Sequence, residues 1–340
     1  ARSVRRQAVR QAREAVDALG HHPSIVLWCA HNEPAPTEAA RSKTFAPSLV
    51  RNLLTQQVPS WNKTILDQWV KRAFEGADET RPVVAHSGGS DSHLFFGWYH
   101  GDERDLDGFA ASMPRMVRFV SEFGTRSVPD SAEFMQPERW PALDWEALSE
   151  HHGLDILTDR FPIAGHTSFD AWRDATQRYQ ADVLRHHIET LRRLKYHPVG
   201  GFCFLSLNDP QPTIGWSVLD HQRRPKLAWA SVVEACRPVI VVADRLPAAV
   251  APGEALALDV HVVSDLREAL EGVECTATLR WPGGGHEWRW RGDVGADTCV
   301  RVGTCQFVVP DTPGELWFDL TIEHDELVAT NRYTGVISAN

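Results

Sequence analysis

Basic residues are scarcer than acidic ones in this 340-residue chain. The 35 Lys and Arg against 45 Asp and Glu leave a net charge of −10. Proteins that bind nucleic acid or anionic membrane surfaces usually present a basic face, so we expect neither partner. The sequence also lacks a run of about 18 apolar residues, which a membrane-spanning helix needs. We therefore expect no membrane as a partner.

Several catalytic signatures are also missing. The chain has no GxSxG turn, no HExxH helix and no glycine-rich phosphate loop. Three histidine pairs, at 21–22, 151–152 and 186–187, lack matching partners at metal-ligand spacing. Adjacent residues on a helix also diverge by about 100°. We expect neither a metal nor a cofactor.

Cysteine is sparse, with six residues and no CxxC pair. Cys29 and Cys203 lie inside apolar runs, which is typical of small buried side chains. Cys299 and Cys305 could face each other across a hairpin, although the sequence does not establish a disulfide. This usage favours a reducing compartment, and hence the cytoplasm. An upstream signal peptide stays open because the chain begins at Ala1.

Residues 1–237 alternate between helical and strand patterns. Apolar residues at helical spacing predict helices over 1–19, 60–77, 165–195 and 225–236. Short apolar runs predict strands at 25–29, 82–86, 94–99, 117–122 and 200–207. Strands that alternate with helices indicate an α/β fold with a parallel sheet.

The pattern changes at Pro238. Gly, Pro and Asp then separate short strands predicted at 239–243, 256–263, 274–280, 287–291, 304–309, 316–323 and 327–334. Seven short strands in roughly 100 residues are typical of an immunoglobulin-like β-sandwich. We therefore expect two domains, 1–237 and 238–340.

Two segments carry the chemistry. HPSIVLWCAHNEP (22–34) and MVRFVSEFG (116–124) are apolar runs that each end on a polar patch with a glutamate. This is typical of a buried parallel strand whose carboxyl end opens into an active site. Two carboxyl groups facing each other across a pocket are the machinery of glycoside hydrolysis. The 13 tryptophans are as consistent with core packing as with a sugar-binding cleft.

These residues resemble glycoside hydrolase family 2, a group of retaining hydrolases with a (β/α)8 barrel. The matching stretches are HHPSIVLWCAHNEP (21–34), DETRPVV (78–84), SDSHLFFGWYHG (90–101), RFVSEFGTRSVP (118–129) and GGFCFLSLNDPQPTIGWSVLDHQRRPKLAW (200–229). The resemblance implies that Glu33 ends the fourth barrel strand as the acid/base. It implies that Glu122 ends the seventh as the nucleophile. Partial desolvation would raise the pKa of Glu33 while Glu122 stays ionised.

The resemblance also implies substrate-binding residues. They are Asn32, which would bind the sugar 2-hydroxyl, and His93, Trp98, Tyr99, Asn208, Asp209 and Trp216. For the aromatic residues the alternative is packing at the barrel rim, and for Asp209 it is fixing the loop. Many family members have a Trp at the positions of Leu205 and Gln211, and this departure leaves the sugar open.

If Glu33 ends the fourth strand, barrel strands one to three lie outside this chain. The fold expected is therefore a partial (β/α)8 barrel, strands four to eight, followed by the sandwich. The N-terminal part of the same enzyme, in cis or in trans, is the expected partner, with a carbohydrate as substrate. We expect a retaining exo-β-glycosidase that acts on β-mannosides, with β-galactosides, β-glucuronides and β-glucosaminides as alternatives. A second class is a non-catalytic carbohydrate-binding or assembly fragment of a split or truncated enzyme.

Overall fold

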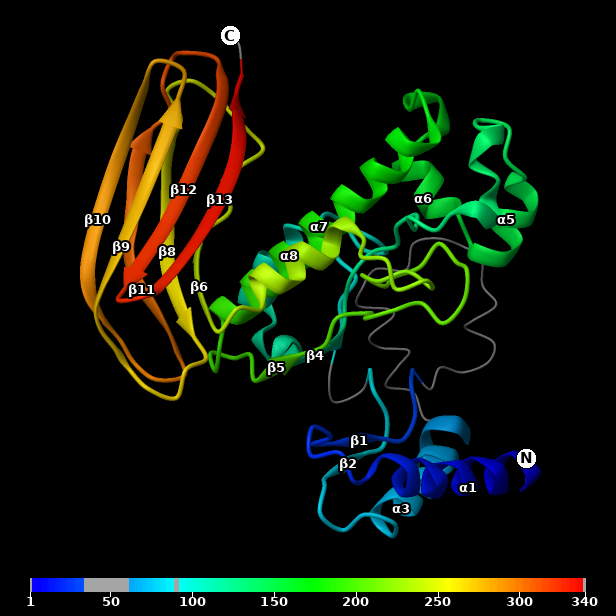
Figure 1. Ribbon diagram of the computed structural model, residues 1–340. Helices are drawn as coiled ribbons and strands as arrows, with labels where there is room; N and C mark the ends of the chain where they lie inside the picture. The colour runs from blue at the N-terminus through cyan, green and yellow to red at the C-terminus, as the bar shows by residue number, and fades with distance from the viewer. Residues whose placement is uncertain (1, 34–60, 89–91, 339–340) are drawn as a thin grey trace.

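The computed structural model describes residues 2–33, 61–88 and 92–338 (Figure 1). Helix α1 (Arg2–Leu19) packs against α3 (Asp67–Glu75), which continues a π-helical turn at Trp61–Leu66. Both helices bury one apolar stripe, as their periodicity predicts. The cluster that they form with the first strand contains Ala12, Val16, Trp28, Val70, Ala73 and Phe74.

Two short parallel sheets follow. β1 (Trp28–Cys29) pairs with β2 (Val83–Val84), and β4 (Phe119–Glu122) lies between β3 (Ser92–His93) and β5 (Gly201–Phe202). Helices α7 (Phe169–Arg193) and α8 (Leu227–Ala235) lie side by side and share an apolar core with the second sheet (Figure 1). The expectation of parallel strands and helices in this region is therefore met. The remaining helices are α4 (Asp105–Ser112), α5 (Trp145–His152) and α6 (Asp155–Arg160), with 3-10 turns at Pro114–Val117, Glu133–Met135, Pro137–Arg139 and Ile163–Gly165.

The strand predicted at 94–99 is wrong. The strand is Ser92–His93, and the chain turns directly after it. The backbone N–H groups of Trp98 and Tyr99 donate to the carbonyl of Phe95 at 3.1 and 3.0 Å, and Gly97 has a φ of +78°. The local turn thus takes the backbone groups that a longer strand would offer to a neighbour. The predicted strand at 200–207 is likewise reduced to Gly201–Phe202.

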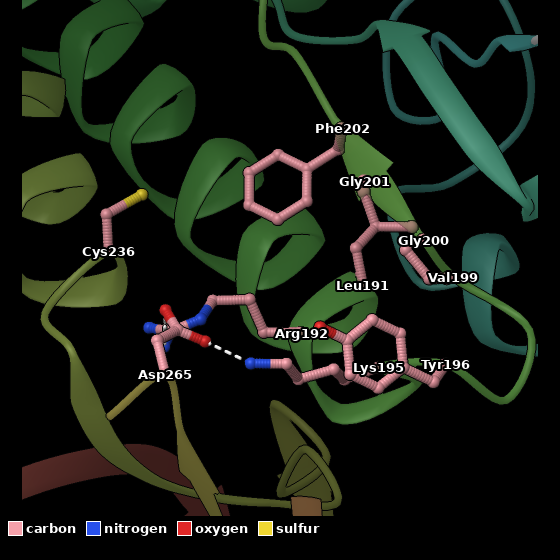
Figure 2. Close-up of a pocket in the computed structure, with 10 residues that line it drawn as sticks. All are labelled: Leu191, Arg192, Lys195, Tyr196, Val199, Gly200, Gly201, Phe202, Cys236 and Asp265. Atoms are coloured by element: carbon pink, nitrogen blue, oxygen red, sulfur yellow. Dashed lines mark hydrogen bonds and ion pairs between the residues drawn. The ribbon is translucent and has the colours of Figure 1, made fainter. Parts of the chain in front are cut away.

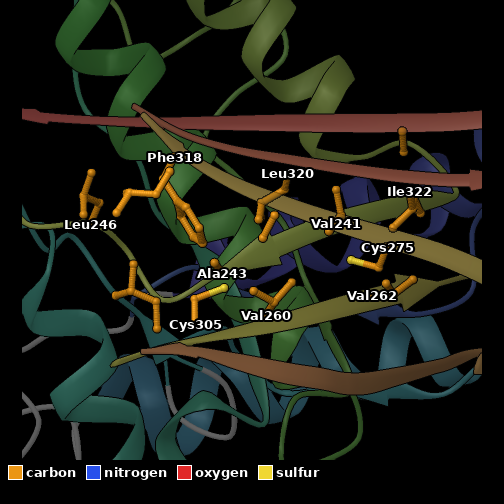
Figure 3. Packing of buried hydrophobic residues seen from close by; sticks show 14 of the residues in the cluster. Val241, Ala243, Leu246, Val260, Val262, Cys275, Cys305, Phe318, Leu320 and Ile322 are labelled. Atoms are coloured by element: carbon orange, nitrogen blue, oxygen red, sulfur yellow. The ribbon is translucent and has the colours of Figure 1, made fainter. Parts of the chain in front are cut away.

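The C-terminal part is two antiparallel-rich sheets that face each other. Its strands are β6 (Val239–Ala243), β7 (Ala249–Val250), β8 (Ala255–Ser264), β9 (Leu270–Trp281), β10 (Gly284–Val294), β11 (Thr298–Val308), β12 (Gly314–His324) and β13 (Leu327–Ile337). One sheet has the order β10-β9-β12-β13-β7 and the other β11-β8-β6. Alternate side chains from both sheets meet in one core, as Figure 3 shows for Val260, Phe318 and Leu320.

Cys299 and Cys305 do not face each other across a hairpin. Both lie on β11, and neither of the two is in a disulfide. The hairpin expectation fails because β11 begins at Thr298 and so includes both residues in one long strand. The register between β11 and β8 shifts between Arg301 and Gly303, inside the same strand. Such an irregularity bends a strand without ending it.

The seam between α7 and the sandwich is ionic. Arg193 forms ion pairs with Asp107 and Asp244, and Lys195 lies 2.5 Å from both Asp265 and Asp297. A cavity of about 270 Å³ opens beside these residues, between α7, β5 and the sandwich (Figure 2). None of the predicted site residues lines this cavity, so it is separate from the region of Glu33 and Glu122.

Apolar side chains are exposed near the outer strands of the parallel sheets. The exposed fractions are 74% for Val26, 44% for Leu27 and 43% for Phe119. Among the described strands, β1 pairs only with β2, and β5 pairs only with β4. Free strand edges beside exposed apolar side chains favour aggregation.

We therefore predict that residues 1–340, expressed alone, are inactive and aggregate. Each Å² of apolar surface left in water forgoes about 25 cal/mol, so a few hundred Å² rivals a typical net stability of roughly 5–15 kcal/mol. Size-exclusion chromatography and thermal melting measure this. Residues 238–340 alone are the control and should stay monomeric, because their core is internal. A monomeric, cooperatively melting and active 1–340 product would contradict the prediction.

Candidate active site

Glu33 is held by the strand end that precedes it. Beyond β1, the backbone N–H of Ser87 donates to the carbonyl of His31 at 2.9 Å. The N–H of Glu33 in turn donates to the carbonyl of Ser87 at 3.3 Å. These bonds extend the parallel pairing of β1 with β2 up to the glutamate. Glu33 has a φ of +40°, an unusual backbone conformation for this residue type that the ladder supports.

Glu122 is placed by the pairing of β3 with β4. His93 stands opposite Glu122 in this register, and the N–H of Leu94 donates to the carbonyl of Glu122 at 2.8 Å. Gly124 follows with a φ of +139°, and a Cβ there would lie 2.9 Å from the carbonyl oxygen of Leu205. Only glycine fits this position, which explains the last letter of the SEFG motif.

The imidazole of His93 joins the two glutamates. Its Nδ1 lies 2.6 Å from Oε1 of Glu33 and 3.6 Å from Oε2 of Glu122. One oxygen of each carboxyl group and the imidazole nitrogen all lie within 4.8 Å of one another. The His93 side chain is 4% exposed, whereas that of Glu122 is 22% and that of Glu33 45% exposed. The two carboxylates thus face a common space that is open to solvent on the side of Glu33.

The pKa of Glu33 runs against the expectation from the sequence. The hydrogen bond from His93 lowers the pKa of Glu33 below its ordinary value, and this effect exceeds the raising effect of burial. The expectation counted burial alone, because nothing in the sequence places His93 beside Glu33. In the protein without substrate, the ionised form of Glu33 is therefore favoured.

The same three residues are the only group within the described ranges that has three possible metal-ligand atoms close together. Two carboxylates and one imidazole suit a divalent cation in chemical type. The Nδ1 atom that would bind the cation, however, already shares a hydrogen bond with Glu33 at 2.6 Å. A cation would have to replace that bond, so the arrangement as it stands serves proton chemistry.

Three of the predicted aromatic residues come together. The ring of Trp216 lies 5.8 Å from that of Trp98 and 5.7 Å from that of Tyr99. The Arg126 guanidinium covers the Trp216 ring at 5.3 Å. Trp98 is buried, whereas Tyr99 remains exposed. One part of this cluster is therefore packed and another part is accessible. It is consistent with both alternatives, packing at the barrel rim and sugar binding.

The remaining predicted residues lie differently. Asn32 is exposed beside Glu33, while Asn208 donates weakly to the carbonyl of Asp209 at 3.4 Å. Asp209 is buried and lies 3.8 Å from Nζ of Lys226, whose pKa burial lowers to about 8. A buried carboxylate beside a buried ammonium suits the loop-fixing alternative for Asp209 better than sugar binding.

Sequence reasoning missed a histidine–aspartate cluster below the site. Asp67 is fully buried on α3 and forms an ion pair with His31, while its other oxygen lies 3.0 Å from Nδ1 of His86. His31 precedes Asn32 and Glu33, and His86 precedes Ser87. Asp67 thus ties together the two strand ends that carry the site. A signal was present in the sequence, because an aspartate on the apolar face of the 60–77 helix requires a partner.

Comparisons with known proteins fit this geometry, although no protein-family model matches the chain. Beta-mannosidase B of Thermothelomyces thermophilus is 26% identical over 272 residues, which are 69% of this chain and 30% of that protein. Its counterpart in Neosartorya fischeri is 27% identical over 271 residues, 72% of this chain and 30% of that protein. The chain spans about 30% of the length of these curated relatives.

Solved structures agree in fold. The beta-D-mannosidase of Dictyoglomus thermophilum aligns with a TM-score of 0.68 and 20% identity over 99% of this chain and 41% of that one. The exo-chitosanase CsxA of Amycolatopsis orientalis aligns with a TM-score of 0.64 and 16% identity over 100% of this chain and 40% of that one. The class that these proteins define is that of glycosidases. The predicted resemblance to the C-terminal region of glycoside hydrolase family 2 is thereby confirmed. No described helix is long and apolar enough to cross a membrane.

The Asp67 cluster predicts a stability effect. Asp67→Asn should lower the free energy of unfolding by about 1–3 kcal/mol, because the buried carboxylate that bonds His31 and lies beside His86 is lost. Denaturant unfolding of the protein that carries this chain measures it. Asp17→Asn, on the exposed face of α1, is the matched control and should change little. Equal effects of the two substitutions would contradict a special role for Asp67.

The Glu33–His93 bond predicts a pH effect. Because the pKa of Glu33 is lowered in the folded protein, its contribution to stability is complete above its ordinary pKa of 4.5. That contribution is lost as the pH falls through the lowered pKa. Between pH 5 and pH 3 the wild-type Tm should therefore fall more than the Tm of Glu33→Gln. Parallel Tm curves for the two proteins would refute this linkage.

Proposed function

We propose that the protein carrying this chain hydrolyses terminal β-linked sugars with retention of configuration. The observation that carries the proposal is the approach of Glu33 and Glu122 to within 4.8 Å at one strand-end edge. Retaining glycosidases place their carboxyl groups about 5–5.5 Å apart, whereas inverting enzymes leave room for a water molecule between them. The short separation supports a double displacement.

In this mechanism Glu122 attacks the anomeric carbon and Glu33 protonates the leaving oxygen. Water then attacks the glycosyl-enzyme while Glu33 acts as base. The lowered pKa of Glu33 in the free protein suits the second step directly. The first step requires Glu33 to take up a proton once the sugar covers the site, because excluding water from a carboxylate raises its pKa. The Nδ1 atom of His93 is within reach of both glutamates and can shift its bond between them.

The substrate proposed is a β-mannoside. The support is the repeated similarity to beta-mannosidases in sequence and fold, and the exo-chitosanase keeps β-glucosaminides as the first alternative. The exposed edge of Tyr99, backed by Trp98 and Trp216, offers a flat apolar surface of the type on which sugar rings stack. β-Galactosides and β-glucuronides remain further alternatives.

We propose further that the catalytic unit is a (β/α)8 barrel completed by strands outside this chain, in cis or in trans. Among the described strands, β1 pairs with β2 alone and β5 with β4 alone, which supports this arrangement, as do the longer relatives. A non-catalytic carbohydrate-binding fragment is the competing function, and a reducing compartment stays the prediction from cysteine usage. The two functions differ in whether hydrolysis occurs at all.

Substitution of the two glutamates tests the reaction. Glu122→Ala should reduce hydrolysis of an aryl β-mannoside by at least about 10⁴-fold, because no nucleophile remains. Glu33→Ala should lose about 10²–10⁴-fold on alkyl β-mannosides but much less on nitrophenyl β-mannosides, which need little acid assistance. Azide should rescue Glu33→Ala and give a β-configured glycosyl azide.

Glu133→Gln is the matched control, because Glu133 is an exposed carboxylate in a 3-10 turn. It should keep wild-type rates on both substrates. If the protein binds mannosides but neither wild type nor Glu133→Gln hydrolyses them, the binding-fragment alternative replaces the enzyme. Equal losses of Glu33→Ala on good and poor leaving groups would remove the acid/base role.

A further inference from the structure

The second ring nitrogen of His93 has its own partner. Nε2 of His93 lies 2.6 Å from Oγ of Ser87, and that oxygen lies 3.1 Å from Oγ of Ser121. With the two carboxylates on the Nδ1 side, the contacts form a continuous row from Glu33 through His93 and Ser87 to Ser121. The His93 ring is almost fully buried within this row.

The chemistry of the partners fixes where the hydrogens go. An ionised carboxylate only accepts hydrogen bonds, so Nδ1 of His93 must carry a hydrogen to bond Glu33. In a neutral imidazole the other nitrogen then holds a lone pair and needs a donor. The Ser87 hydroxyl can donate to Nε2 while its oxygen accepts from Ser121.

We propose that Ser87 is a positioning residue that fixes the Nδ1–H tautomer of His93 and so keeps that N–H directed at the Glu33–Glu122 pair. The inference rests on the proposed glycosidase function. The side chain of Ser87 acts on the imidazole, because its Oγ lies 2.6 Å from Nε2 of His93.

The hydroxyl also permits His93 to become charged without turning. When His93 gains a proton, Nε2–H donates to the Ser87 oxygen, and the Ser87 hydroxyl hydrogen turns to Ser121. The Nδ1–H bond to Glu33 is the same in both charge states. Alanine, valine or any other side chain without a hydroxyl removes the hydrogen bond between this oxygen and Nε2 in both charge states.

The position of Ser87 is tied to that of Glu33. The backbone of Ser87 donates to His31 at 2.9 Å and accepts from Glu33 at 3.3 Å. The same backbone ladder therefore sets the acid/base and the residue that orients its histidine. Side-chain substitutions at Ser87 leave both backbone bonds available, which makes the hydroxyl testable by itself.

The test is the tautomer of His93, read by two-dimensional 1H–15N NMR of the histidine side chains. The sample is the full-length protein that carries this chain, and His93→Gln identifies the signals of His93. In wild type we expect a protonated Nδ1 and an unprotonated Nε2 for the neutral ring. Ser87→Thr should keep this pattern. Ser87→Val should lose it, because valine has the shape of threonine but no hydroxyl. Ser121→Ala should keep the tautomer, since Ser87 can still donate.

The kinetic expectation follows from the same variants. Ser87→Val should lower kcat for an aryl β-mannoside about 10-fold, the effect of one charge-linked hydrogen bond, with KM nearly unchanged. Ser87→Thr should restore kcat to within about 3-fold of wild type. A Ser87→Val protein that fails to fold does not decide the matter, because the wild-type tautomer is measured independently of any variant.

The outcomes separate the two proposals. A wild-type His93 with its hydrogen on Nε2, or a Ser87→Val protein with unchanged tautomer and kcat, overturns the role of Ser87 while hydrolysis stands. Loss of the expected tautomer in Ser87→Val, but not in Ser87→Thr, in a protein that hydrolyses no aryl glycoside supports the role of Ser87 and overturns the proposed function.

Discussion

The parallel pairing of β3 with β4 is the constraint on which the site depends. It sets His93 opposite Glu122, and a shift of one residue would turn either side chain to the other face of the sheet. Both strands are short, so few backbone bonds hold the register. The buried residues Val120 and Phe123 on either side of Ser121 and Glu122 reinforce it, because each would have to leave the core in a shifted register. The packing of Val120 and Phe123 thus keeps His93 and Glu122 opposite each other.

The imidazole of His93 offsets the repulsion between the carboxylates of Glu33 and Glu122. Two ionised carboxylates within 4.8 Å repel each other, and burial alone would drive one of them to take up a proton. The hydrogen bond from His93 stabilises the ionised form of Glu33, and this explains why the pKa of Glu33 is lowered. Without substrate, the candidate site therefore favours the ionised form of Glu33.

Local patterns in the sequence predicted much of the fold. The helix α1, the long helix α7 and the strands of the sandwich all lie close to where periodicity and turn residues indicated. The strand at 94–99 could not be excluded from the sequence, because its apolar residues suit a strand and a packed turn equally well. The hydrogen bonds that the Phe95 carbonyl accepts from Trp98 and Tyr99 make this segment a turn.

The candidate site was likewise predicted only in part. The approach of Glu33 and Glu122 follows from motifs that each end a strand, whereas the contacts of His93 with Glu33 and Ser87 join residues from separate strands. Such contacts depend on register, and register is a tertiary property that periodicity does not contain. Asp67 illustrates the point, because its two histidine partners come from different strand ends.

The ionic seam between α7 and the sandwich bears on how the protein is made. The sandwich is the last part of this chain to leave the ribosome, so α7 must wait with its outer face uncovered. Arg193 at the end of α7 and Lys195 just beyond it carry charges that water solvates well. An apolar surface on the helix would favour aggregation during this interval, whereas the charged surface keeps the nascent helix soluble. Pairing with Asp244, Asp265 and Asp297 then selects the correct docking position once the sandwich has folded.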